Sequence, residues 1–276
     1  MPQTVRTTVH RQQTRRSCHY IRYAAVLCAL LVARVVSADP VRVRHPEGPA
    51  HGFLILTDTA DKPLAHGEWI QWLEKGVVAS ELIFRFDDGS LYDETARFSQ
   101  KDVFRLESYH LVQKGPSFST NIDEQFDRSG KYAVRSREAD TDEKTLTGTT
   151  EIPRDTYNGM TPTILKNLTK GASAKTHLLA FTPKPRILEL HSTPEDTDKY
   201  WVGGSESTAT RFLIKPDVPG LTGVVATVIG KQPPSFRMWI AQGNAPVLVR
   251  FEGPLYAEGP PWRIGLSAPR FDGPNK

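Results

Sequence analysis

Residues 236–253, FRMWIAQGNAPVLVRFEG, carry the clearest strand pattern in this chain. Apolar side chains alternate with others on both sides of a Gly243-Asn244 pair, and the apolar set is Phe236, Met238, Ile240, Val247, Val249 and Phe251. A period of two is typical of a β-strand with one buried face, and Gly-Asn is a favoured two-residue hairpin loop. The stretch therefore predicts a β-hairpin with one wholly apolar face.

The loop also predicts the register of this hairpin. With Gly243-Asn244 as the loop, the expected pairs are Ile240 with Val247, Met238 with Val249, and Phe236 with Phe251. A shift of one residue would mix the two faces, so pattern and loop favour the same register. Pro246 would then face Ala241, where antiparallel strands exchange no hydrogen bond. On the other face, beside Arg237 and Arg250, Trp239 should form a half-exposed patch or lie under a lid.

Further runs with strand character fill most of the chain, with turn residues and prolines between them. The predicted strands are residues 53–56, 66–74, 77–86, 91–98, 103–112, 120–126, 131–137, 176–181, 186–191, 210–215, 221–229 and 262–267. The parity of the apolar positions changes near Ser108, which indicates a β-bulge or a strand buried on both sides. This spacing predicts a mainly β fold, a curved antiparallel sheet that forms an open or partial β-barrel.

One short helix is predicted in the middle of the chain. Thr161 suits an N-cap, Pro162 suits the first helical position, and Gly171 ends the segment. Its apolar stripe is Ile164, Leu165 and Leu168. We expect this helix to act as a lid on the sheet.

The first 38 residues have the features of a secretory signal peptide. Arginines without any acidic residue precede an apolar run over residues 24–33, and small residues follow at Ser37 and Ala38. An uncleaved anchor is the alternative, although the run is shorter than the about 20 residues of a bilayer span. We therefore expect an exported protein of the periplasm, with outer-membrane association left open, and no transmembrane segment in the mature chain.

Removal of this segment changes the charge and the cysteine content. Subtracting its six arginines from the 35 basic residues leaves 29, against 31 acidic residues, a net charge of about −2. Without a basic excess, nucleic acid is not an expected partner. Cys18 and Cys28 leave with the signal, so the mature chain has no disulfide and no cysteine ligand. The predicted organisation is a signal peptide (1–38), a linker (39–50), a single β-rich domain (51–268) and a tail (269–276).

The order of these elements resembles a known group of proteins. The β-rich first half, the helix near residues 161–170, Trp239-Ile240, then Ala245-Pro246-Val247 and Arg250-Phe251 resemble a family of exported bacterial proteins containing a domain of unknown function. That family is similar in architecture to the periplasmic lipoprotein carrier and receptor, the Lol proteins. Over residues 52–267 the resemblance implies an unclosed β-barrel with helices over an apolar cavity.

No catalytic constellation is recognisable in the sequence. The segment 203–207, GGSES, has Ser207 where a nucleophile elbow needs glycine. The mature histidines lack metal-ligand spacing, although an assembly in three dimensions stays open, and the acidic clusters near residues 140–143 and 195–198 fit no calcium loop. We therefore expect no enzyme, no cofactor and no metal.

Two functional hypotheses follow. The first is a non-enzymatic envelope carrier for a lipid, a lipoprotein or another apolar ligand, because concave apolar surfaces suit such ligands. The residues expected to line its binding wall are Phe236, Met238, Ile240, Val247, Val249, Phe251, Ile164 and Leu168. The alternative is a scaffold protein of envelope or exopolysaccharide assembly that binds a protein partner and has a solid core. A glycan hydrolase with paired carboxylates is a third, weaker reading. An apolar cavity would favour the carrier, and a filled interior the scaffold.

Overall fold

The computed structural model describes residues 1, 40–181, 184–202, 205–219, 233–256 and 258–267. Residues Ala38–Lys276 form one compact unit, which contains all of the described strands. The strands are β1 (Ala50–Thr57), β2 (Pro63–Glu74), β3 (Val77–Phe86), β4 (Leu91–Gln100), β5 (Phe104–Lys114), β6 (Thr120–Asp127), β7 (Lys131–Glu138), β8 (Lys144–Thr149), β9 (Ala174–Phe181), β10 (Pro185–Val202), β11 (Ser205–Asp217), β12 (Phe236–Ala241), β13 (Val247–Gly253) and β14 (Trp262–Ser267). One short helix, α2 (Thr161–Lys166), lies between β8 and β9.

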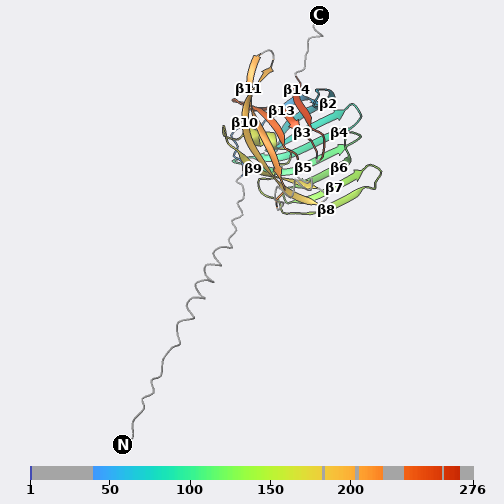
Figure 1. The fold of residues 1–276 in the computed structure, drawn as a ribbon, viewed down its shortest axis with the longest axis vertical. Helices are drawn as coiled ribbons and strands as arrows, with labels where there is room; N and C mark the ends of the chain where they lie inside the picture. The colour runs from blue at the N-terminus through green and yellow to red at the C-terminus, as the bar shows by residue number, and fades with distance from the viewer. Residues whose placement is uncertain (2–39, 182–183, 203–204, 220–232, 257, 268–276) are drawn as a thin grey trace. The chain divides into compact units, whose positions relative to one another are not determined.

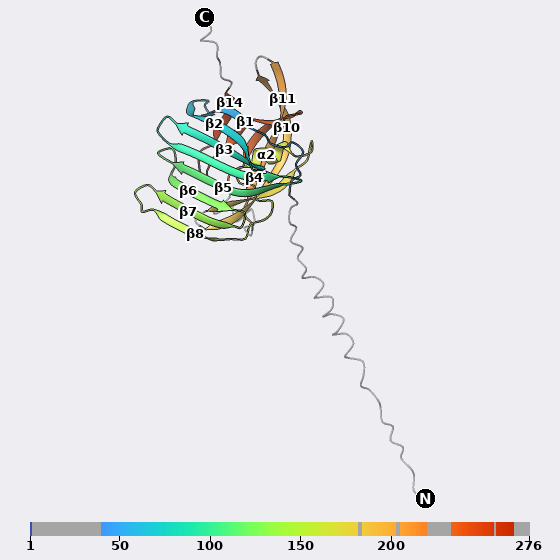
Figure 2. The same ribbon diagram turned by 180° about the vertical axis from the view of Figure 1, so that it is seen from behind.

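All of these strands belong to one antiparallel sheet that does not close. Its order is β8-β7-β6-β5-β4-β3-β2-β1-β14-β13-β12-β11-β10-β9, so β1 pairs with β14 and the two ends of the sheet are β8 and β9. From one side β9–β14 lie nearest the viewer (Figure 1), and from behind β2–β8 do (Figure 2), because the sheet curls around its interior. The predicted mainly β, open-barrel fold is confirmed.

The connection from β8 to β9 fills the concave side of the sheet. Met160, Ile164 and Leu165 are at most 3% exposed and belong to one apolar core with strands from both halves of the chain. The helix packs against β12 and β13. Just before it, the Asn158 side chain donates to the Leu179 carbonyl and accepts from the Leu179 amide. This segment therefore covers the free edge of β9, where unpaired backbone groups would otherwise face solvent.

The predicted hairpin is present, but its predicted loop and register are wrong. Residues 242–246 form the connection, and Met238 pairs with Phe251, not with Val249. A register shift between Trp239 and Ile240 leaves Val249 without a partner and places Leu248 opposite Ile240. Period two defines which side chains share a face, but it permits slips of two residues and β-bulges. In the observed register Leu248 packs against the apolar core.

The same hairpin corrects the prediction for Pro246. Ala241 pairs with Val247, so Pro246 lies in the connection and pairs with no strand. Within the loop Gly243 has a positive φ of 148°, whereas Asn244 is not among the positive-φ residues. A two-residue loop at Gly243-Asn244 would have Gln242 and Ala245 as its closing pair, whereas the observed pairing ends at Ala241 and Val247, so the connection is longer than predicted.

The helix is shorter than predicted and begins one residue earlier. Met160 is the N-cap residue, because its carbonyl accepts the hydrogen bond of the Ile164 amide, and no side chain caps the helix. The helix ends at Lys166, and Gly171 terminates only the following turns with φ +76°. The predicted N-cap at Thr161 is therefore wrong. Proline is tolerated at either of the first two helical positions, so Pro162 did not distinguish Thr161 from Met160 as the N-cap.

Other sequence predictions need smaller corrections. Pro194 and Pro216 lie inside strands, the first at a register shift in β10 and the second beyond the part of β11 that pairs with β12. Both sites spare a ladder hydrogen bond, which is where strands tolerate proline. β8 was not predicted. The bulge near Ser108 is confirmed, because Arg97 pairs with Ser108 and Phe98 with Leu106. The predicted strand 221–229 lies outside the described residues.

Candidate functional site

The predicted ligand wall is largely part of the packed core. Met238, Ile240, Phe251 and Ile164 are 0–7% exposed and join the central apolar cluster. Phe236 and Leu168 are partly buried against that cluster. Val247 and Val249 are half-buried but do not belong to it, because the bulge turns Leu248 toward the core instead. These two residues therefore lie outside the apolar cluster that contains the other predicted residues.

Two open pockets among the described residues lie elsewhere. One, of about 280 Å³, is a polar groove over β5, β6 and β7 that includes Asn121, Asp123 and Arg135. The other, of about 310 Å³, lies between the N-terminal segment, the end of α2 and the β12–β13 connection. Neither is lined by Met238, Ile240 or Phe251, so neither is the apolar cavity that a carrier was expected to have.

The second pocket borders a buried ion pair. Lys166 Nζ lies 2.5 Å from Glu47 Oε1, with both side chains less than 10% exposed, and 5.6 Å from the centre of the Trp69 ring. Gln71 Nε2 donates to Glu47 Oε2 at 3.1 Å. Asn167 Oδ1 accepts from the amides of Arg44 and His45 at 2.7 Å each. Residues predicted as a linker are thus tied to the end of the helix.

Two carboxyl groups lie in the interior of the sheet. Glu94 on β4 and Glu124 on β6 both face Leu111 of β5, so the three share one face. Tyr109 Oη donates to Glu94 Oε1 at 2.8 Å. Burial raises the pKa of Glu94 despite this bond, and burial together with the charge of Glu94 raises the pKa of Glu124 to about 8. Gly159 lies directly over Glu94, because a Cβ there would be 3.5 Å from its Cδ. Among the pockets described above, neither reaches these acids.

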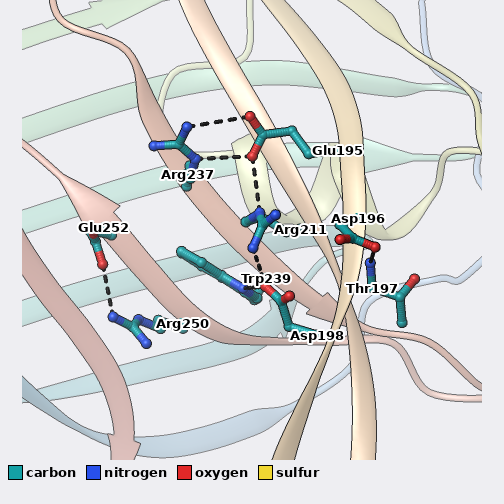
Figure 3. Close-up of polar contacts among 9 residues, drawn as sticks. All are labelled: Glu195, Asp196, Thr197, Asp198, Arg211, Arg237, Trp239, Arg250 and Glu252. Carbon is teal, nitrogen blue, oxygen red and sulfur yellow. Dashed lines mark hydrogen bonds and ion pairs between the residues drawn. The ribbon is translucent and has the colours of Figure 1, made fainter.

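The outer face of β10–β13 carries a network of charged side chains (Figure 3). Glu195 Oε2 accepts from the Nε atoms of Arg211 and Arg237 at 3.0 Å each, and Asp198 Oδ2 accepts from Arg211 at 2.7 Å. The hydrogen bonds and charges of the two arginines hold the pKa of Glu195 below its usual value. Arg250, paired with Glu252 at 2.8 Å, continues the network on β13.

Trp239 lies within this network, on the face predicted for it. Its indole Nε1 donates to Asp198 Oδ2 at 2.6 Å, and the Arg250 guanidinium lies 5.0 Å from the ring centre. The ring is half-buried, because charged side chains of neighbouring strands cover it. This is the half-exposed patch of the prediction. Trp239 is therefore held in place by charged side chains of β10 and β13.

A hairpin arm, defined here as residues 193–202 and 205–208, projects from this surface. β9 pairs with β10 only as far as Ser192, and β12 pairs with β11 only from Ala209 to Ile214. Figures 1 and 2 both show β10 and β11 extending past the other strands. Near the tip, Trp201 is 64% exposed. Within the described residues, Lys199–Val202 and Ser205–Thr208 pair only with each other, whereas residues 193–198 pair with the part of β11 that also pairs with β12.

A cluster of ionisable side chains lies at the other end of β10. Glu189 pairs with His177 of β9 and with Asp217 of β11, and His191 is two residues farther along the same face. Lys175 Nζ lies 2.7 Å from Glu189 Oε2. Desolvation opposes ionisation here, but the hydrogen bond and charge of Lys175 outweigh it and lower the pKa of Glu189.

Comparisons with known proteins name no activity. No family model matches the sequence, and no curated protein matches it either. Among solved structures, the chain is similar to the crystal structure of a beta-barrel-like protein of a domain of unknown function, DUF1849, from Brucella abortus. The sequences are 11% identical, the match covers 82% of this chain and 97% of that one, and the TM-score is 0.45. The more specific similarity to the Lol proteins stays a prediction.

Sequence reasoning missed the arm, the charged network and the ionisable cluster. The signal for the cluster was present, since Glu189 and His191 at positions i and i+2 of a strand share a face. Their partners His177 and Asp217 lie 12 and 28 residues away from Glu189, and only strand pairing brings them together. The predicted strand 186–191 stops before Pro194, so Glu195, Asp196 and Asp198 fall outside it.

Proposed function

We propose that the protein is a non-enzymatic scaffold of the cell envelope that binds a protein partner through its hairpin arm. The observation that carries this proposal is the arm itself, a pair of strands that extends past the sheet and exposes Trp201. From Thr193 to Val202, the outer edge of β10 pairs with no described strand. Long unpaired edges readily accept a further strand, so proteins normally cover or shorten them.

The partner that fits this edge is an extended segment of another protein. A strand added to β10 would gain main-chain hydrogen bonds, and an exposed aromatic ring beside it would supply an apolar contact. Trp201 is the type of residue that dominates binding energy at protein interfaces. Location in the envelope is supported by the features of residues 1–38, which are those of an export signal.

The alternative of a carrier for an apolar ligand has less support. Its predicted wall is occupied by packed side chains, with Ile240 completely buried, and the pockets found lie outside that wall. A lipid would have to displace core side chains to enter. The sequence carries no recognisable catalytic motif, which favours a binding role over an enzymatic one.

The proposal is tested by site-specific crosslinking in the producing cells. A photoreactive amino acid replaces Trp201 in one sample and Leu73 in another, because Leu73 on β2 is also an exposed apolar residue, 49% accessible. We expect a defined protein adduct from position 201 and none from position 73. The same partner should be recovered with the Leu73→Ala variant and lost with Trp201→Ala. Equal adducts from both positions, or equal recovery with both alanine variants, would refute the proposal.

A further inference from the structure

We propose that Glu189, His191, Asp217 and His177 form a binding site for one divalent transition metal ion, with Zn²⁺ as the ion that best suits its donors. This site lies on three adjacent strands, away from the hairpin arm, and does not depend on the proposed function. The four residues supply two imidazole nitrogens and two carboxylates. Zinc takes this mixture of ligands, usually four of them in a tetrahedron.

The distances between donor atoms match this geometry. Ligands bound about 2.0–2.2 Å from a tetrahedral zinc lie about 3.3–3.6 Å from one another. Here His191 Nε2 is 3.3 Å from Glu189 Oε2, and His177 Nε2 is 3.8 Å from Glu189 Oε1. One donor atom from each of Glu189, His191 and Asp217 lies within 4.8 Å of the other two. Three of the donors are thus already near one point, and rotation of the Glu189 and His177 side chains would bring His177 Nε2 to the same ion as the fourth.

A buried carboxylate supplies the second, independent observation. Asp155 is 1% exposed, and both of its oxygens lie 2.9 Å from His177 Nδ1. A hydrogen bond at Nδ1 assigns a proton to that nitrogen, so Nε2, on the side of Glu189, is the atom that would bind a metal ion. Histidines that bind metals usually donate their other ring nitrogen to such a carboxylate, which fixes the ring and increases its basicity. The backbone holds the pair as well, because the amide of His177 donates to the Asp155 carbonyl.

Lys175 offsets the charge of Glu189 in this cluster. Its ammonium lies 2.7 Å from Glu189 Oε2, and its side chain is 44% exposed. An exposed lysine has many rotamers and gains little from one surface ion pair. A divalent cation bound by four ligands would displace it into solvent. Lys175 therefore competes with the metal, and removing it should strengthen binding.

The test uses untagged full-length protein in which Cys18 and Cys28 are replaced by serine, so that thiolates contribute nothing. Zn²⁺ binding is measured by calorimetry, and Co²⁺ is used to report tetrahedral coordination through its visible absorption. We expect one ion per chain, at least tenfold weaker binding in His191→Ala, and a 10–100-fold loss in Asp155→Asn, in which the orienting carboxylate is removed. Lys175→Met should bind more tightly, by at least threefold. Mg²⁺ should not compete, since its preferred ligands are all oxygen.

Two controls separate this site from ordinary surface histidines. His110 also lies beside a carboxylate, 3.0 Å from Asp123 Oδ1, and His110→Ala should leave Zn²⁺ affinity unchanged. Lys199→Met removes an exposed lysine paired with Glu206 and matches the charge change of Lys175→Met. The site is overturned if wild type and His191→Ala bind equally, if Asp155→Asn has no effect, or if both lysine variants change affinity equally. Circular dichroism of each variant shows that a loss of binding is not a loss of fold.

Discussion

Replacement of Glu124 by glutamine should stabilise the protein at neutral and alkaline pH. The pKa of Glu124 is raised from 4.5 to about 8 by burial and by the charge of Glu94. A carboxyl group whose pKa is raised on folding binds its proton more tightly in the folded state. Its contribution to stability is therefore fully present below about pH 4.5 and is lost as the pH rises through about 8. At about 1.36 kcal/mol per pH unit between pH 4.5 and 8, the free energy of unfolding falls by about 5 kcal/mol.

Urea unfolding at pH 5, 7 and 9 measures this effect. The wild-type free energy of unfolding should fall by several kcal/mol over this range, and Glu124→Gln should remove most of the fall because glutamine stays neutral. Below pH 5 the carboxyl groups with lowered pKa, such as those of Asp123 and Glu195, begin to take up protons. Their contribution to the stability of the protein is lost as the pH falls, which is opposite in direction to the effect of Glu124. Glu151→Gln, at an exposed position, is the control for loss of a carboxylate. If Glu124→Gln shows the wild-type pH dependence, Glu124 is not held protonated by the core.

Three further predictions follow from the packing. Phe251→Ala should lower the free energy of unfolding by about 3–5 kcal/mol and Val249→Ala by less than about 1.5 kcal/mol, because only Phe251 is a core residue. Urea unfolding measures both, and equal losses would support the predicted register. Lys166→Met should destabilise by about 3–5 kcal/mol by leaving the Glu47 carboxylate buried and unpaired, and Lys166→Met with Glu47→Gln should recover part of the loss. Solvent extraction of the purified protein should release no stoichiometric lipid by mass spectrometry; a bound lipid would favour the carrier.

The sequence predicted those strands in which apolar period two is bounded by turn residues. β3 and β14 were predicted with their observed ends, since each lies between well-marked turns. β8, KTLTGT, has little apolar content, because it is an edge strand with most positions exposed, so its pattern carried no signal. β10 was predicted to end before Pro194, because a local rule treats proline as a strand end. Pairing with β11 around a bulge overrides that rule.

The candidate sites depend on long-range pairing and were harder to predict. The alternation in residues 236–251 correctly placed Met238, Ile240 and Phe251 on one buried face. Alternation could not tell a ligand wall from a core, since both require apolar side chains on one face. That distinction comes from α2, whose Ile164 and Leu165 fill the space over β12 and β13. The register of Glu189 with His177 and Asp217 likewise has no local signal.

The energetics of the arm fit an element that gains stability on binding. Fixing the backbone costs about 1–2 kcal/mol for each residue, whereas a hydrogen bond contributes only about 0.5–1.5 kcal/mol net. The arm buries no residue of the core cluster, and at its base Arg211 joins it to the rest of the sheet through Glu195 and Asp198. Its strands are therefore only marginally stable beyond that anchor. A partner strand along β10 would supply the missing hydrogen bonds. Amide exchange in residues 197–202 should thus be fast in the free protein and slow in the complex, whereas exchange in core strands such as β3 should not change.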